Sequence, residues 1–284
     1  MTVKNEIRGS KEKQALELAI GGISFRFQGM DRELMRLSDK TYGLFNSRSG
    51  AADHSASVSR PEPREPLPAD DLLLGSEAGT GRAVIAAPYF RGSACGDFSE
   101  GTLEIFSCPN AEYDEKAVEN YIRWVTANIL MKTGAGLLLH ASASVVEGAA
   151  HVFLGPHGSG KSTASSLTKN GFIIADDVLP VLMKNGKAVA AAMPAVGKFP
   201  QEAENTGSYP VKSFYWLIKS ERNRIVRVGR PQAAGLLMAS APFISGSAGS
   251  PSGLFPQVLS LLESVPMYNL HFRKEEGFLR DACE

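Results

Sequence analysis

Residues 151–177 of the 284-residue chain read HVFLGPHGSGKSTASSLTKNGFIIADD, and this stretch predicts how the rest of the chain is organised. It contains Gly155, four further residues and then Gly160, Lys161 and Ser162, which is the pattern of a phosphate-binding P-loop. The apolar residues 152–154 predict a buried strand before the loop, and residues 162–169 have the composition of a helix after it. Glycines let successive backbone N–H groups turn towards phosphate oxygens, and a helix N-terminus adds partial positive charge.

The motif assigns a role to each of its side chains. We expect Lys161 to reach the β- and γ-phosphates of ATP, and the hydroxyl of Ser162 to hold Mg²⁺. His157 occupies a variable position, where a loop-filling role is favoured over a phosphate contact. The expected nucleotide-binding residues are Gly155, Pro156, His157, Gly158, Ser159, Gly160, Lys161, Ser162 and Thr163.

An acidic pair follows the motif at a distance of one helix and one strand. Asn170 and Gly171 predict the end of the helix, and the apolar residues 172–175 predict a short buried strand that ends at Asp176 and Asp177. The pair can therefore lie beside the phosphates. Two carboxylates there suit two tasks of phosphoryl transfer, holding the metal and accepting the proton of an acceptor hydroxyl. The alternative interpretation is a surface turn.

Residues 137–177, from the apolar run that ends at His140 to the acidic pair, resemble the catalytic domain of HPr kinase/phosphorylase. That family carries a histidine, a short hairpin, the P-loop, a helix and an Asp-Asp strand in this order, and it is distantly similar in fold to phosphoenolpyruvate carboxykinase. The resemblance implies an α/β fold with a P-loop kinase core, and a kinase that uses ATP and Mg²⁺ to phosphorylate a serine hydroxyl. It implies Asp176 as the base, Asp177 as a ligand of metal or water, and His140 as a neighbour that tunes the pair. With Lys161, Asp176 and His140 form the expected catalytic set.

The chain departs from that family after the acidic pair. HPr kinases carry an acidic signature containing Arg-Gly-Leu-Gly, whereas residues 193–200 of this chain read MPAVGKFP. The signature is tied to the phosphorylase direction and to the HPr partner. We therefore expect the acceptor to be a serine on another peptide or protein, and the reverse reaction to be poor.

The composition indicates a globular chain, with 43% hydrophobic and 21% charged residues. Thirty basic and thirty acidic residues cancel, so bulk charge favours neither nucleic acid nor an anionic membrane as a partner. The polar N-terminus is unlike a signal peptide, and Cys95, Cys108 and Cys283 have no metal-ligand spacing. We expect a reduced, cytoplasmic protein. Whether it forms a homo-oligomer stays open.

Two domains are predicted, a small β-rich N-terminal domain at residues 1–110 and the catalytic domain at residues 111–284. Residues 46–71 are rich in serine, alanine, proline and charge, which predicts a loop or linker. Residues 113–132 predict an amphipathic helix with one buried stripe, which connects the domains. Residues 214–218 and 225–228 predict two strands of a hairpin. Its basic residues, whose role the sequence leaves undecided between a solvated hairpin and a phosphate clamp, are Arg222, Arg224, Arg227 and Arg230.

Three functions fit these motifs. The leading hypothesis is a kinase with a serine acceptor on a peptide or protein. The second is a nucleotide-gated regulatory module that binds ATP without transfer, which would not need the acidic pair as a base. The third is a carboxykinase-like enzyme that acts on a small acid, although the basic substrate-binding motifs of that family are not visible in the sequence.

Overall fold

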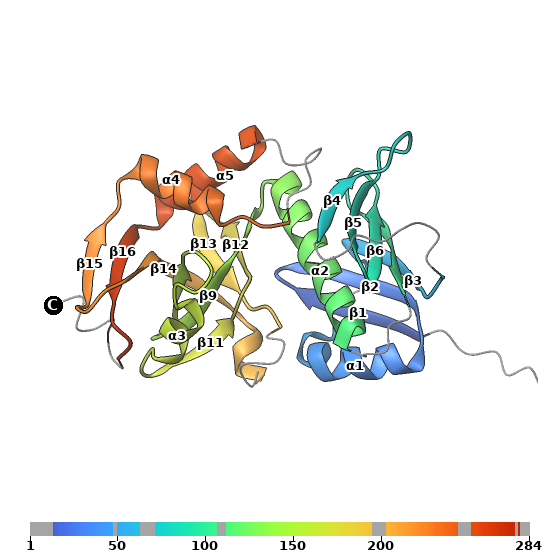
Figure 1. Ribbon diagram of the computed structural model, residues 1–284, viewed down its shortest axis with the longest axis horizontal. Coiled ribbons are helices and arrows are strands. Elements are labelled where there is room, and N and C mark those ends of the chain that lie inside the picture. Colours follow the sequence, from blue (N-terminus) through green and yellow to red (C-terminus); the bar gives the residue numbers. More distant parts are fainter. Residues whose placement is uncertain are drawn as a thin grey trace, which may run out of the picture.

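Two β-sheets flank one long helix, α2 (Glu112–Thr133), in the computed structural model (Figure 1). The structure describes residues 14–47, 50–62, 72–106, 112–194, 203–243, 251–275 and 278. The chain therefore has the mixed α/β architecture that the sequence predicts. No helix within these residues is long and apolar enough to cross a membrane.

The N-terminal sheet has seven strands in the order β1-β2-β3-β7-β6-β5-β4. Strand β3 runs parallel to both of its neighbours, β2 and β7, and the other pairs are antiparallel. The helix α1 (Arg32–Tyr42) and the short η1 (Gly43–Phe45) follow β2. The strands are β1 (Gln14–Ile20), β2 (Ile23–Met30), β3 (His54–Ser59), β4 (Leu73–Ser76), β5 (Ala83–Ala87), β6 (Phe90–Ala94) and β7 (Glu100–Ile105).

The predicted loop at residues 46–71 is wrong in its middle, because β3 lies there in the interior of the sheet. His54, Ala56 and Val58 are buried, while the intervening serines are not, which is the alternation of a half-buried strand. Serine and alanine fill these positions, so the hydrophobic pattern is weak in the sequence. Residues 63–71, with three of the four prolines of this stretch, lie outside the described residues.

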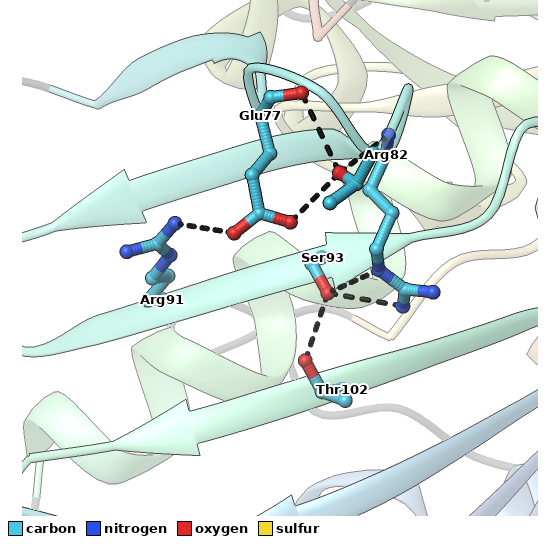
Figure 2. Close-up of polar contacts among 6 residues, drawn as sticks. Glu77, Arg82, Arg91, Ser93 and Thr102 are labelled. Carbon is cyan, nitrogen blue, oxygen red and sulfur yellow. Dashed lines mark hydrogen bonds and ion pairs between the residues drawn. The ribbon is translucent and has the colours of Figure 1, made fainter.

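The face of β4–β7 that points away from α2 carries a polar network (Figure 2). Arg82 donates from Nε and Nη2 to the Oγ of Ser93, at 3.1 and 3.0 Å, and Ser93 shares a 2.9 Å hydrogen bond with Thr102. Arg91 forms an ion pair with Glu77 across the sheet at 3.3 Å. These contacts pair the polar side chains of the outer face with one another. The opposite face of the sheet is apolar and packs on α2.

Helix α2 is buried on more than the one predicted stripe. Tyr121 and Trp124 are fully buried in addition to Val118, Ile122 and Val125. The phenol of Tyr121 packs over Gly101 of β7, where an added Cβ would overlap its hydroxyl group. The helix ends as predicted, since Gly134 has a φ of 68° and the N–H groups of residues 134 and 135 donate to the carbonyls of residues 131 and 130. The later turns of the helix, packed by both sheets, are therefore mainly apolar, whereas Glu112, Glu115 and Lys116 of its first turns are not buried.

The second sheet has nine strands, with β11-β9-β10-β14-β13-β12-β8 in one path and β16 and β15 beyond β14. Strands β10, β14 and β16 run parallel, and the other neighbours are antiparallel. The strands are β8 (Gly136–Leu139), β9 (Ala141–Val146), β10 (Ala149–Leu154), β11 (Gly171–Ala175), β12 (Leu179–Lys184), β13 (Lys187–Ala191), β14 (Ser208–Lys219), β15 (Arg224–Arg227) and β16 (Met267–Phe272). The helices here are α3 (Lys161–Ser166), η2 (Ala203–Thr206), α4 (Arg230–Ala239) and α5 (Pro251–Ser264).

The predicted hairpin of residues 214–228 is wrong, because β14 and β15 are not neighbours. Strand β16 lies between them, parallel to β14 and antiparallel to β15. Strand β15 runs antiparallel to β16 and therefore to β14, so it returns the chain to the end of the sheet at which β14 begins. Helices α4 and α5 lie in the connection from there to β16. Local sequence signals cannot show such an insertion.

One contiguous core runs from the N-terminal sheet through α2 to the second sheet. The turn between β1 and β2 reaches β12, where Gly21 and Gly22 lie against Pro180 and Leu182. A smaller core around Phe153, Ala164 and Phe278 fills the space under α3. The predicted division into residues 1–110 and 111–284 as separate folding units stays a prediction, which a truncated chain can test.

Candidate functional site

A cavity of about 780 Å³ lies between the charged face of α2 and the glycine-rich loop, residues 155–160, that joins β10 to α3. It brings together most of the residues that the sequence assigns to ATP and to catalysis. Its lining residues are Glu112, Glu115, Lys116, Glu119, Arg123, His140, His157, Gly158, Gly160, Lys161, Ser162, Thr163, Asp176, Asp177 and Lys274.

The sheet topology explains this meeting of the loop and the acidic pair. Strand β9 lies between β10 and β11 and is antiparallel to both, so β10 and β11 run in the same direction. Their carboxyl ends therefore lie at one edge of the sheet, and the glycine-rich loop and Asp176 each follow directly. The prediction that the pair can lie near the loop is thus met by the fold.

The glycine-rich loop folds around the side chain of Lys161. The Nζ of Lys161 donates to the carbonyl oxygens of Gly155 and Pro156 at 2.9 and 3.3 Å. Gly155 has a φ of 146°, and a Cβ there would lie 2.7 Å from the Oγ of Ser159. That buried Oγ has no hydrogen-bond partner within the described part of the chain. Burial lowers the pKa of Lys161, and the charges of Asp177 and Asp176 oppose this change.

The hydroxyl of Ser162 donates to Asp176, with 2.6 Å between Oγ and Oδ1. Ser162 lies in the first turn of α3 and Asp176 directly after β11. Helix α3 is shorter than predicted, since it ends at Ser166, and Asn170 adopts a φ of 56° before β11 begins. This contact joins the last polar residue of the motif to the first aspartate of the pair.

Asp177 makes a different set of contacts. Its Oδ1 lies 3.2 Å from the Nδ1 of His140, and its Oδ2 lies 2.9 Å from Nη1 of Arg123. Its backbone carbonyl accepts from Ala141, and its φ of 95° is unusual for a residue with a side chain. Burial by itself raises the pKa of Asp177, but the hydrogen bond with His140 and the charge of Arg123 outweigh it, so this pKa lies below its ordinary value.

Arg123 also forms an ion pair with Glu119, one helical turn earlier on α2. Sequence reasoning missed both residues, although a signal was present. Between residues 117 and 131 they are the only charged side chains, at the i, i+4 spacing of a helical pair. A charged pair in a segment of otherwise uncharged residues indicates that charge is required at this place in the fold.

The remaining predicted residues fall into three groups. His157, Gly158, Gly160 and Thr163 line the cavity. The basic residues 222, 224, 227 and 230 are exposed and do not line it, whereas Lys274, which follows β16 and was not predicted, does. Residues 195–200 of the segment that replaces the HPr-kinase signature lie outside the described residues, as do Cys108 and Cys283. Among the described residues, no three His, Cys, Asp or Glu side chains converge as a metal site.

Comparison with known proteins gives one family match. The model of a protein family described as SynChlorMet cassette protein ScmC matches residues 108–279, which is more than half of the chain and contains the whole cavity. No curated protein matches the sequence. Among solved structures, the Hpr(Ser) kinase/phosphatase from Coxiella burnetii is similar over 48% of this chain and 84% of its own, with 11% identity and a TM-score of 0.27.

Proposed function

The chain belongs to the family of the SynChlorMet cassette protein ScmC, and we propose that it is a kinase that transfers the γ-phosphoryl group of ATP to a serine hydroxyl of a peptide or protein. The observation that carries the proposal is the 2.6 Å hydrogen bond between Asp176 and Ser162, the last residue of the P-loop sequence. P-loop enzymes hold Mg²⁺ with the hydroxyl that follows the motif lysine and with an aspartate at a neighbouring strand end.

The residues of the cavity fit ATP and Mg²⁺. Gly158 and Gly160 have φ values of 73° and 102°, which glycine adopts without strain, and nothing lies within 4 Å of a Cβ added at Gly158. The buried Oγ of Ser159 lacks a partner among the described residues and is able to donate to a phosphate oxygen. Lys161 would exchange its two carbonyl contacts for the β- and γ-phosphates. Mg²⁺ would supply charge neutralisation at the phosphates.

The hydrogen bonds favour the reverse of the roles that the resemblance gives the two aspartates. Asp176 bonds the hydroxyl expected on the metal, so we assign Asp176 and Ser162 to Mg²⁺. Asp177 is the poorer metal ligand, because Arg123 already lies 2.9 Å from it and would repel a divalent cation. The assignment of Asp176 as base and Asp177 as metal ligand remains the alternative.

His140 is then the proposed proton acceptor. Asp177 engages its Nδ1 at 3.2 Å, which leaves Nε2 as the ring nitrogen available in the cavity. A carboxylate in this position holds an imidazole in the tautomer that accepts a proton at Nε2. As the serine oxygen bonds to the γ-phosphorus, the bond to the bridging oxygen of ADP breaks and the hydroxyl proton passes to His140.

The test is phosphoryl transfer by the purified full chain. With γ-³²P-labelled ATP and Mg²⁺, we expect label on serine of a suitable peptide or protein acceptor and little label on HPr. Phospho-HPr with inorganic phosphate should release little pyrophosphate. Efficient action on HPr in either direction would contradict the proposed acceptor. Mg²⁺-dependent ATP binding with no turnover, even against water, would favour the nucleotide-gated module.

A further inference from the structure

Arg123 is a charged residue of the cavity wall whose side chain is mostly shielded from solvent. Its side chain is 13% exposed and that of Glu119 is 14% exposed, and no other residue between 117 and 131 is charged. Removing two charges from water is costly, and a pair in such a place is weak support for stability. Stability alone therefore gives little reason for a guanidinium at this position of α2.

The contacts of Arg123 point towards the Asp177–His140 pair. Its guanidinium bridges Glu119 and Asp177, so it is fixed by its own helix and in turn fixes a carboxylate of the second sheet. His140 engages only Oδ1 of Asp177, and a single contact leaves the carboxylate free to rotate. The second contact, from Nη1 of Arg123 to Oδ2, stops that rotation. The plane of the carboxylate is then set by two partners on opposite oxygens.

We propose that Arg123 is a positioning residue of this site, which acts through Asp177 to hold His140 in its proton-accepting orientation, and that Glu119 fixes Arg123 in turn. This inference rests on the proposed function for its catalytic consequence. It also assigns α2 a task in the chemistry, in addition to its packing between the two sheets.

Several other charged or titratable groups act on the cluster of Glu119, Arg123, His140 and Asp177. They are Tyr42 on α1, Glu115 and Lys116 on α2, Lys161 on α3 and Asp176 after β11. Arg123 and His140 favour the ionised form of Asp177, whereas its own burial opposes that form. Burial raises the pKa of Glu119, Arg123 lowers it and Asp177 raises it. Removing the guanidinium leaves the carboxylate of Asp177 held by His140 through Oδ1.

The experiment compares Arg123→Met, which keeps an unbranched stem without the charge, with a double variant Arg123→Met/Glu119→Gln. The double variant leaves no unpaired buried carboxylate on α2, so a loss that it shares with the single variant cannot come from misfolding around Glu119. Arg26→Met is the control, because Arg26 forms a comparable partly exposed ion pair with Glu17 on the N-terminal sheet, away from the cavity.

The first readout needs no activity. The tautomer of His140 is followed at one pH by ¹⁵N NMR of its ring, assigned with His140→Gln, and we expect the form that carries its proton on Nδ1 to be less populated in both Arg123 variants than in the wild type and in Arg26→Met. In the kinase assay we expect kcat to fall about 10- to 100-fold, because a small misplacement of a catalytic group costs up to about 10²-fold in rate. The KM for ATP should change little.

An unchanged population of the His140 tautomers in Arg123→Met would overturn the inference, as would a wild-type kcat in an active enzyme. If the double variant recovers wild-type activity, the guanidinium is structural and the inference is wrong. A wild type that binds no ATP would defeat the proposed function instead, and the tautomer of His140 would still decide whether Arg123 holds the Asp177–His140 pair.

Discussion

The Oγ of Ser162 and the Oδ1 of Asp176 lie 2.6 Å apart, although Ser162 lies in the first turn of α3 and Asp176 follows β11. The contact exists because β10 and β11 run in the same direction on either side of β9. The contact brings the hydroxyl of the motif and the first aspartate together, whereas the side chain of Asp177 contacts His140 and Arg123. Two adjacent carboxylates thus have separate surroundings.

Asparagine substitutions separate the roles of these two carboxylates. We expect Asp176→Asn to raise the Mg²⁺ concentration needed for half-maximal turnover, because the metal loses a charged ligand. Asp177→Asn should leave that concentration nearly unchanged and lower kcat by roughly 10²–10⁴-fold, the usual contribution of acid–base catalysis. Magnesium titrations of both variants at saturating ATP measure this. The opposite pattern would restore Asp176 as the base.

The lowered pKa of Asp177 predicts a pH-dependent contribution to stability. A carboxyl group whose pKa is lower in the folded state than its value of about 3.9 in the unfolded chain stabilises the fold above that value. This contribution is lost as pH falls through the folded-state pKa. The difference in unfolding free energy between the wild type and Asp177→Asn should therefore shrink between pH 6 and pH 3. The side chain is 47% exposed, so solvent screening keeps the effect small.

Urea unfolding at several pH values measures that difference. A difference that stays constant over this range would show that Asp177 titrates alike in the folded and unfolded chain. A difference that grows towards acid pH would contradict the lowered pKa.

The close packing of Tyr121 over β7 predicts the effect of enlarging Gly101. In Gly101→Ala the added methyl group would overlap the phenol oxygen and the backbone carbonyl of Ser93. We expect a loss of about 1–3 kcal/mol in unfolding free energy, as for other overpacked cores. The matched control is Gly96→Ala, because nothing lies within 4 Å of a Cβ at that exposed glycine. Equal stability of the two variants in urea would contradict the packing.

The continuous core predicts the behaviour of a truncated chain that begins at residue 109. Removing the N-terminal sheet would expose one side of α2, including the buried Tyr121 and Trp124. We expect this chain to lose cooperative unfolding in urea or to aggregate. Cooperative unfolding at the midpoint of the full chain would show that residues 111–284 form an independent domain, as the sequence alone predicts.

The sequence predicts those parts of the fold that depend on neighbouring residues. The strand before the glycine-rich loop, the helix α2 with its Gly134 cap, and the Asn185–Gly186 hairpin between β12 and β13 all follow from local pattern. Strand β3 is not predicted from the sequence, because its inward residues are histidine, alanine and valine in a serine-rich stretch. The position of β16 in the sheet is not predicted either. It depends on pairing with β14, about fifty residues away, which no local signal encodes.

The residues of the candidate site likewise divide into those that a local pattern predicts and those that it does not. Lys161, Ser162 and the two aspartates can be selected from a motif and its spacing, and the cavity brings them together. Arg123 reaches Asp177 from a helix that precedes the motif, and Lys274 enters from the chain after β16. Their contributions depend on tertiary packing. Even so, an ion pair at i, i+4 spacing within an otherwise uncharged stretch of a helix is a pattern that can be searched for in a sequence.

Calorimetric titration of the wild type and of Lys161→Ala with ATP, each with and without Mg²⁺, tests the central claim most directly. Lys184→Ala, at the exposed end of β12, is the control for removal of a lysine outside the cavity. We predict that the wild type and Lys184→Ala bind ATP with Mg²⁺, and that Lys161→Ala binds it at least about tenfold more weakly, because the β- and γ-phosphates lose their fixed cation. Equal ATP affinity in all three proteins, or no binding by the wild type, would contradict the account.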